Sequence, residues 1–585
     1  MHTFNRFTHL SLSTMKHPIF LLFLSLSLFV SCNRQGEEVS LASFLEEGTI
    51  EGDATLAFHH ALDYCRAHKA KALVIPRGTY NVYPDYAYER YAWVTNNDAS
   101  LKRILLDLRD MHGFEVRGDS STIVLHGFMS PMFIDHCSDI KVSGLNIDCE
   151  RTFHSEGLIK AVGDDYIDVS FSEAYPYRVE GGKIHYYDKQ GVEYPSSHML
   201  EFDAVLREPA YRAVDYWTGE EVPVEEPEEG IVRFFVRNIK ATVGNIMVMG
   251  ASNRYCPAFV LAHSEGVTLQ DVNIWHAGGM GVVGQFSKDI ELQRVHVVPS
   301  PGKGRIISIT ADATHFVHSS GYLRMIDCDF FNQIDDATNI HGIYAIVKRL
   351  LPDNRLLVSF GNGAQVGLEL LQPDMDVEIV NKDNLIANAE AKVTSVSRFN
   401  QECSEVAVEG DLSAVKEGDL IVPSISPEVL IKGCRLGKNR ARGFLLGSRK
   451  STTIEDCFFH TSGASILLEG DGYYWYEQAG PRNVTIRNNT FSDCMYGAWT
   501  WGSAVIASGA GPRSDRLESA YNRNLLIENN HFILTDPRLL NIYSTDSCVV
   551  RNNSIEFSTT YPKDPAHEGK EMFITKDSRR IHIEQ

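Results

Sequence analysis

A short segment of one type recurs along this chain, and the recurrence constrains the fold more than any other feature. Each copy alternates apolar and polar residues, passes a small residue or an asparagine, and ends in another apolar pair. Copies begin at Asp139, Gly266, Asp289, Tyr322, Val429, Thr452, Asn483, Asn524 and Cys548. Their spacing is about 23 residues, lengthened in places by loops. Such segments predict strand, tight turn and strand, and the repeat predicts an all-β solenoid, a parallel β-helix.

Asparagine and cysteine occupy matching positions in successive copies. Asn489, Asn530 and Asn553 each follow a predicted strand. Asparagine tolerates a left-handed backbone there, and its amide can bond the asparagine of the next coil. Cys434 and Cys457 lie one period apart, which we interpret as a ladder of small buried side chains rather than a disulfide.

Three acids fall at neighbouring positions of two successive copies. Asp312 and Asp335 are 23 residues apart, so we expect them on adjacent coils, about 4.8 Å apart along the stack. Asp335 and Asp336 would point to opposite faces of a straight strand, and we expect a bend that turns both outward. His315 and His341 share this surface, either as substrate-binding residues or as hydrogen-bonded turn histidines.

Clustered carboxylates suit the hydrolysis of glycosidic bonds. One carboxylic acid protonates the leaving oxygen, and one carboxylate activates water or attacks carbon; a separation of about 6.5–9.5 Å favours inversion. Crowded carboxylates raise one another's proton affinity, so one stays protonated while another is ionised. We therefore predict that Asp312, Asp335 and Asp336 are catalytic rather than solvated turn residues.

The run from Glu469 to Glu477 is a second candidate for contact with a sugar. It combines acids with a tryptophan and three tyrosines. Sugars stack on aromatic rings, while carboxylates accept hydrogen bonds from their hydroxyls. We therefore name Glu469, Asp471 and Trp475 as candidate substrate-binding residues. The alternative is an amphipathic loop that packs on the rest of the protein.

Composition excludes several partners and cofactors. The 585 residues include 76 acidic and 55 basic ones, and the net charge of −21 disfavours nucleic acid, an anionic membrane surface and acidic polysaccharides. The sequence shows no glycine loop that would cradle phosphate and no Cys-x-x-Cys pattern for a metal. We expect neither a cofactor nor a metal, and a neutral sugar as substrate.

The N-terminus predicts export. An apolar run from Ile19 to Ser31 follows a lysine and is too short to span a membrane comfortably, so residues 1–32 are predicted to be a signal peptide that starts at Met1 or Met15. Ser31-Cys32 resembles a bacterial lipobox, which would make Cys32 the lipidated first residue of an envelope protein. Phe29 departs from the usual aliphatic residue, which leaves a periplasmic or secreted protein as the alternative.

The remaining chain divides into coils and insertions. We expect a helical cap and the first coils over residues 33–150, and a β-rich insertion over residues 151–258. Central coils with the acids follow at 259–342, then an inserted barrel of short strands at 343–425, then C-terminal coils at 426–585. The cap resembles that of pectin-degrading β-helix enzymes, where an amphipathic helix covers the end of the solenoid.

The segments from Arg305 to Phe316 and from Gln333 to Gly342 resemble glycoside hydrolase family 110. These are bacterial exo-α-1,3-galactosidases that remove terminal galactose from blood group B-type glycans. The resemblance implies an inverting, metal-independent hydrolase on a right-handed β-helix, and a homodimer. It places the acids at Asp312, Asp335 and Asp336, and we assign Asp335 as general acid, with the other two activating water. Whether branched or linear glycans are preferred stays open.

Two other classes use a similar scaffold. A calcium-dependent polysaccharide lyase would also present an acidic cluster, but it acts on uronates and takes Arg or Lys as base. A glycan-binding solenoid such as an adhesin would need aromatic platforms but no stacked acids. Sensitivity to a chelator would favour the lyase, and release of galactose would exclude both.

Overall fold

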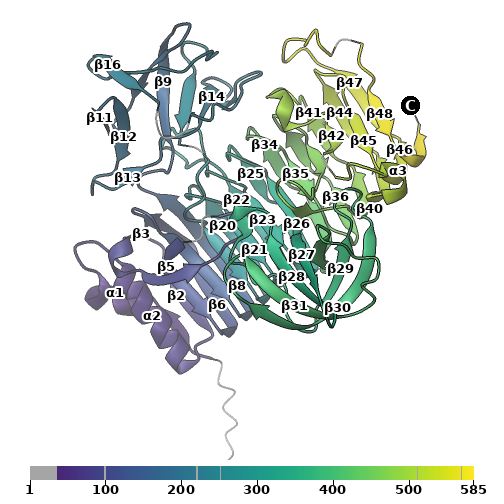
Figure 1. The fold of residues 1–585 in the computed structure, drawn as a ribbon. Coiled ribbons are helices and arrows are strands. Elements are labelled where there is room, and N and C mark those ends of the chain that lie inside the picture. The colour runs from purple at the N-terminus through teal and green to yellow at the C-terminus, as the bar shows by residue number, and fades with distance from the viewer. Residues whose placement is uncertain are drawn as a thin grey trace, which may run out of the picture.

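The computed structural model describes residues 36–97, 100–218, 222–250, 252–509, 511–567 and 569–584. Two long sheets of 20 and 13 strands, paired in parallel along the coils, run the length of the molecule (Figure 1). The predicted parallel β-helix is therefore confirmed. The predicted signal peptide and Cys32 lie outside the described residues. Within them, no helix has both the length and the apolar character needed to cross a membrane.

Successive coils stack with their repeats in register. In the larger sheet, β20 (Glu265–Ile274) pairs in parallel with β8 (Ser138–Cys149) and with β22 (Lys288–Val297). Val267 therefore lies beside Ile140 on one side and Ile290 on the other, and all three are buried. The apolar positions of the repeat thus become continuous rows inside the solenoid.

Aromatic and thiol side chains form similar rows in the C-terminal coils. Phe459 stacks on Phe491 with ring centroids 4.5 Å apart, and Phe491 stacks on Phe532 at 4.8 Å. Cys434 and Cys457 are free, buried thiols, as are most of the described cysteines. The expected row of small buried side chains in place of a disulfide is confirmed.

The asparagine ladder is present, but the residue with the left-handed backbone is not the one that was predicted. The side-chain amide of Asn489 donates to Asn530 Oδ1 at 3.0 Å, and that of Asn530 donates to Asn553 Oδ1 at 3.0 Å. The left-handed residue of each turn is the one before the ladder asparagine, with φ of +57° at Asn488. The reversal at that residue turns the next side chain into the buried interior, where its amide bonds its neighbour.

A helix covers the first coil. α2 (Thr55–His68) buries Ala57, Phe58, Ala61 and Leu62 against the solenoid, while the Asp53 side chain accepts a hydrogen bond from the Thr55 amide at 2.8 Å. β2 (Ala72–Ile75) and β3 (Thr79–Val82) then pair in parallel with β6 (His112–Leu125). The predicted cap and the first coils are continuous with the larger sheet.

The first insertion leaves the solenoid after β8 and returns before β19 (Phe259–Ala262). Its main element is a seven-stranded sheet that includes β9 (Ser155–Val162), β14 (Met199–Asp203) and β18 (Ile246–Met249). A three-stranded sheet, β11 (Tyr177–Glu180), β12 (Lys183–Tyr187) and β13 (Glu193–Tyr194), lies beside it. Glu156 of β9 accepts hydrogen bonds from the amides of Ile306 and Ile307, which fastens the insertion to the loop before Asp312.

The second insertion is a closed six-stranded barrel. Its strands are β27 (Ala345–Leu351), β28 (Arg355–Phe360), β29 (Asp376–Val380), β30 (Ala387–Arg398), β31 (Cys403–Glu409) and β32 (Leu420–Pro423). It leaves the coil directly after β26 (Thr338–Ile343), the strand that follows two of the acids (Figure 1). Gln365 donates to the Trp475 carbonyl at 3.0 Å, so the barrel contacts the aromatic loop.

Candidate active site

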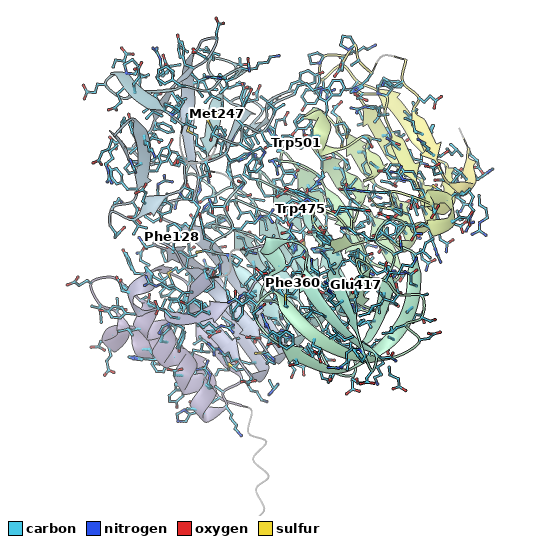
Figure 2. The ribbon with its side chains drawn as sticks, viewed as in Figure 1. Phe128, Met247, Phe360, Glu417, Trp475 and Trp501 are labelled. Atoms are coloured by element: carbon cyan, nitrogen blue, oxygen red, sulfur yellow. The ribbon has the colours of Figure 1, made fainter. Side chains whose placement is uncertain are left out.

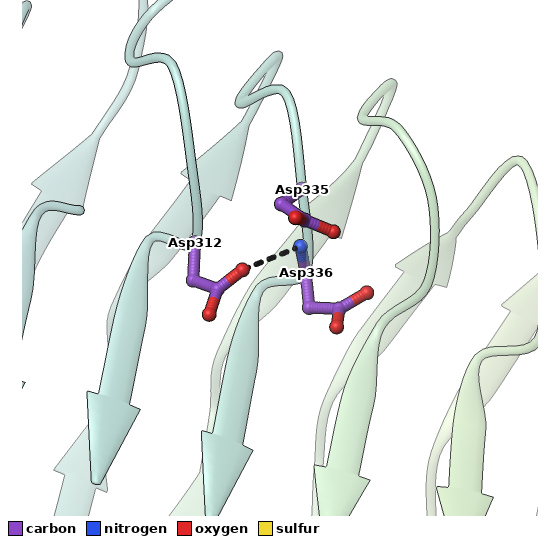
Figure 3. Close-up of side chains that lie close together, drawn as sticks. All are labelled: Asp312, Asp335 and Asp336. Carbon is purple, nitrogen blue, oxygen red and sulfur yellow. Dashed lines mark hydrogen bonds between the residues drawn. The ribbon is translucent and has the colours of Figure 1, made fainter. Parts of the chain in front are cut away.

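Asp312 and Asp336 stack on neighbouring coils of the smaller sheet. β23 (Thr314–Val317) pairs with β26 so that Thr314 faces Thr338, and the residues two positions earlier are Asp312 and Asp336. The Asp336 amide donates to Asp312 Oδ1 at 3.3 Å (Figure 3). The coil is therefore 24 residues long here, and the sequence-based pairing of Asp312 with Asp335 is wrong by one position, because repeat lengths vary locally.

A bend before β26 brings Asp335 to the same place. The backbone bends at Asp335, as expected, instead of continuing as a strand. Its carboxylate joins the other two, and one oxygen from each acid lies within 4.8 Å of the others (Figure 3). Asp312 and Asp336 are buried and Asp335 is half-buried. The structure thus brings together all three predicted catalytic acids.

Arginines neutralise two of the three carboxylates. Asp335 accepts hydrogen bonds from Arg254 at 2.7 Å and Arg440 at 3.2 Å. Burial raises the pKa of Asp335, but the charges of these arginines outweigh burial and hold it below its usual value. Asp336 accepts two hydrogen bonds from Arg442, both 2.9 Å long. Burial raises the pKa of Asp336 to about 8, even against the charge of Arg442. The two-point contact with the guanidinium is, however, the contact of an ionised carboxylate, and on this ground Asp336 is assigned as ionised.

Asp312 is the acid whose surroundings favour a proton. Its hydrogen-bond partners are the Asp336 amide and His315 Nδ1, at 2.7 Å. Burial and the charge of Asp335 raise the pKa of Asp312 to about 7. Asp335 and Asp336 are ion-paired with arginines, whereas the side-chain partner of Asp312 among the described residues is His315, so the proton of the cluster is assigned to Asp312.

Two buried histidines extend this contact into the protein. His315 Nε2 lies 3.0 Å from His341 Nε2, and His341 Nδ1 lies 2.8 Å from the Gly342 carbonyl. Burial holds the pKa of His315 well below its usual value, so this imidazole stays neutral between Asp312 and His341. The two rings fix the orientation of the Asp312 carboxyl group.

These contacts bear on two predicted roles. His315 and His341 are buried behind Asp312 and lie outside the pocket lining, which favours the alternative of hydrogen-bonded histidines over substrate-binding residues. The ion pairs of Asp335 do not fit the predicted role of general acid, because its arginines stabilise the ionised form. The sequence shows the acids but not which of them an arginine would neutralise.

The acids form one wall of a pocket that opens to solvent. Its lining is polar: the buried Glu477 accepts hydrogen bonds from Asn96 at 2.9 Å and from Asn339 at 3.3 Å. Leu445, Glu469, Asp471 and Trp475 complete the lining together with Arg254, Arg442 and Gly470. The predicted aromatic loop and the predicted acids therefore share one pocket.

Asp471 and Trp475 have different parts in this wall. The carboxylate of Asp471 accepts hydrogen bonds from the amides of Tyr473, Tyr474 and Trp475, so it shapes the loop. The Trp475 side chain is 39% exposed and borders the pocket. Trp475 is thus the member of the loop that is free to stack on a sugar.

Several lining residues escaped the sequence interpretation. Arg442 precedes β35 (Phe444–Leu446), whose register with β26 sets Arg442 beside Asp336 on the next coil. The repeat predicts the position of Arg442 beside Asp336 once the inserted barrel is left out of the coil. Asn96 and Arg254 lie in loops without a repeat, and no sequence signal marks them.

Replacing Trp475 with alanine should lower kcat/KM for the sugar substrate about tenfold, since one aromatic stacking surface contributes about 1 kcal/mol or more. The melting temperature should hardly change, because Asp471 and Gln365 hold the backbone of this loop, not the indole. Kinetics and thermal melts of the purified variant measure both. Unchanged kinetics with a lower melting temperature would show that the loop is structural.

The activity should fall as pH rises through about 7. Asp312 is protonated below its raised pKa and loses the proton above it, so a step that needs this proton slows about tenfold per pH unit above pH 7. A pH profile of kcat/KM between pH 4 and 9 tests this expectation. A rate that stays constant to pH 9 would contradict it.

Comparison with known proteins agrees with this architecture. Residues 155–247 and 355–421 match the domain families described as GLAA-B beta-barrel domains I and II. Residues 415–508 match the right handed beta helix region, which confirms the predicted handedness. Among solved structures, the A-module of mannuronan C-5 epimerase AlgE4 from Azotobacter vinelandii aligns with 94% of this chain and 98% of its own, at 10% identity and a TM-score of 0.40.

Paired acids in a pocket on a parallel β-helix suit a carbohydrate-active enzyme, and among these a glycoside hydrolase. Alpha-1,3-galactosidase A of Shewanella woodyi is 30% identical over 94% of this chain and 89% of its own. Alpha-1,3-galactosidase B of Bacteroides thetaiotaomicron is 26% identical over 89% and 86%. The chain belongs to the α-1,3-galactosidase family, as its resemblance to glycoside hydrolase family 110 predicts.

Proposed function

We propose that this protein is an exo-acting, inverting glycoside hydrolase that releases terminal α-1,3-linked galactose. Its substrates are blood group B-type glycans and linear glycans that end in Galα1-3Gal. The observation that carries the proposal is the pocket that Asp312, Asp335 and Asp336 line together. A pocket accommodates the terminus of a chain, which suits removal of one sugar at a time.

The contacts support the following division of roles. Asp312 donates its proton to the oxygen that leaves with the rest of the glycan, as the bond from that oxygen to galactose C1 breaks. Asp335 and Asp336, both ionised, take the proton of a water molecule whose oxygen bonds to C1. Arg254 and Arg442 keep these two acids charged in the buried site. No covalent sugar intermediate is required.

The stereochemistry of the product tests the inverting mechanism. Attack by water from the face opposite the leaving group converts the α-linkage into β-galactose. One oxygen from each acid lies within 4.8 Å of the others, a separation shorter than the roughly 6.5–9.5 Å that is usual in inverting enzymes. We expect early proton NMR spectra of the digest to show β-galactose first. Early α-galactose would refute inversion.

A calcium-dependent lyase is the second candidate, because three clustered carboxylates could hold a cation. Two of the carboxylates are already paired with guanidinium groups. Burial lowers the pKa of Arg254, Arg440 and Arg442, but their carboxylate partners outweigh burial and raise it, so none can act as a base. These contacts favour hydrolysis over lyase chemistry and over simple glycan binding.

Galactose release from branched and linear α-1,3-galactosyl trisaccharides tests the proposed function. We expect free galactose from both, at rates that a chelator does not change. Loss of activity on chelation, or an unsaturated uronate product from acidic polysaccharide, would favour the lyase. Binding of the trisaccharides without release would indicate a non-catalytic glycan receptor.

We further propose that the enzyme is exported and anchored through a lipid on Cys32, and that it acts on galactose-terminated glycans of host glycoproteins or glycolipids as a homodimer. The support is the apolar N-terminal run that ends in Ser31-Cys32, and the family resemblance. Replacing Cys32 with serine should move the protein from the membrane fraction to the soluble fraction. An unchanged distribution would contradict lipid anchoring.

A further inference from the structure

An exposed tryptophan of the first insertion lies one side chain away from Asp335. The Trp217 side chain is 64% exposed. Its ring packs on the fully buried His198, with ring centroids 4.4 Å apart. A large apolar ring that is held in place and still open to solvent is a surface on which a sugar can stack.

A buried chain of polar contacts ties Trp217 to Asp335. Arg440 donates to Asp335 Oδ1 at 3.2 Å and to Asp215 Oδ1 at 2.6 Å, and its guanidinium carbon lies 5.8 Å from the Trp217 ring centroid. Asp215 also accepts a hydrogen bond from Trp501 Nε1 at 3.0 Å, and in the view of Figure 2 Trp501 lies between the first insertion and the C-terminal coils. One side chain therefore separates Trp217 from the catalytic acid.

Different arginines of Asp335 contact the pocket lining and Trp217. Arg254 donates to Asp335 and also to the Asn96 carbonyl at 3.2 Å, and Asn96 bonds Glu477 in the pocket lining. Arg440 joins the same carboxylate to the exposed Trp217, which lies outside the pocket lining. An enzyme that removes a terminal sugar holds it in the pocket and cleaves the bond at the carboxylates. The remaining glycan then extends out of the pocket.

We propose that Trp217 and Arg440 form a subsite for the sugar on the leaving-group side of the cleaved bond. This inference rests on the proposed function. The ligand is a neutral pyranoside whose apolar face stacks on the indole while a hydroxyl accepts a hydrogen bond from the guanidinium. Because Trp217 belongs to the first insertion, the insertion contributes to the choice of glycan, separately from the recognition of galactose.

The test compares two substrates that differ in the leaving group. A linear Galα1-3Gal trisaccharide carries a sugar there, whereas α-galactosyl fluoride carries only fluoride. Trp217→Ala should lower kcat/KM for the trisaccharide about tenfold. The kcat/KM for the fluoride and the inhibition constant of free galactose should both stay within twofold of the wild-type values. Trp217→Phe, which keeps an aromatic face, should recover most of the loss. Trp475→Ala should lower kcat/KM for both substrates.

Phe557→Ala is the matched control, because Phe557 is also 64% exposed and lies on β47 (Ser554–Phe557) in the last coils. Phe557→Ala should leave kcat/KM unchanged for both substrates. Equal loss on both substrates after Trp217→Ala would overturn the subsite, and so would an unchanged trisaccharide rate. A wild-type enzyme that cleaves neither substrate would overturn the proposed function as well. An active wild type with an unaffected Trp217→Ala variant would overturn the subsite alone.

Discussion

Asp312→Asn is expected to lower kcat for an α-1,3-galactosyl trisaccharide at least about 100-fold, because a general acid contributes about 10²–10⁴-fold. The same variant should keep a much larger share of its activity on α-galactosyl fluoride, since fluoride departs with little help from a proton. Asp335→Asn and Asp336→Asn should lose activity on both substrates, because both still require an activated water.

This pattern separates the two possible assignments of the acid. If Asp335 donates the proton, as the sequence interpretation holds, then Asp335→Asn is the variant that keeps its activity on the fluoride. The amide keeps the shape of the side chain, and melting temperatures near that of wild type would show that each loss is chemical. Equal losses for all three variants on both substrates would contradict the division of roles.

Arg305→Met is expected to lower the free energy of unfolding by up to about 3–5 kcal/mol, because it leaves the buried Asp148 carboxylate with the partly exposed Lys303 in place of a buried guanidinium. Arg305 pairs with Asp148, and both side chains are almost fully buried beneath the loop that leads to Asp312. Loss of this pair should also loosen that loop and reduce activity. Chemical unfolding of the variant measures the stability change.

Lys303→Met is the control for that experiment. Lys303 contacts the same carboxylate at 2.8 Å, but its side chain is 42% exposed. An exposed partner contributes about 0–1 kcal/mol, so this variant should remain near wild-type stability. Similar losses in the two variants would show that burial of the Arg305 pair does not determine its contribution.

The sequence predicts the fold well because a solenoid repeats its signal in every coil. Strand alternation, the Asn489 ladder and the free thiol of Cys434 all follow from local patterns that recur. The exact register does not follow, because a coil can gain one residue in a bend without disturbing the apolar alternation. The single extra residue between Asp312 and Asp336 is such a case.

The site is only partly predictable for a related reason. The acids lie on coils and share the repeat, so their proximity follows from spacing. Arg254 and Trp217 reach the same region from the first insertion and its flanking loop, whose path no repeat defines. Protonation depends on these partners, so the role of Asp335 could not be read from the acids alone.

The most direct test of the central claim is to measure kcat/KM of the wild-type enzyme for three disaccharides, in which galactose is joined to galactose by α-1,3, α-1,4 or α-1,6 bonds. We predict release of free galactose from the α-1,3 compound, at a rate at least about 100-fold above those of the other two. No galactose from the α-1,3 compound, or equal rates for all three linkages, would contradict the assignment of this protein as an α-1,3-galactosidase.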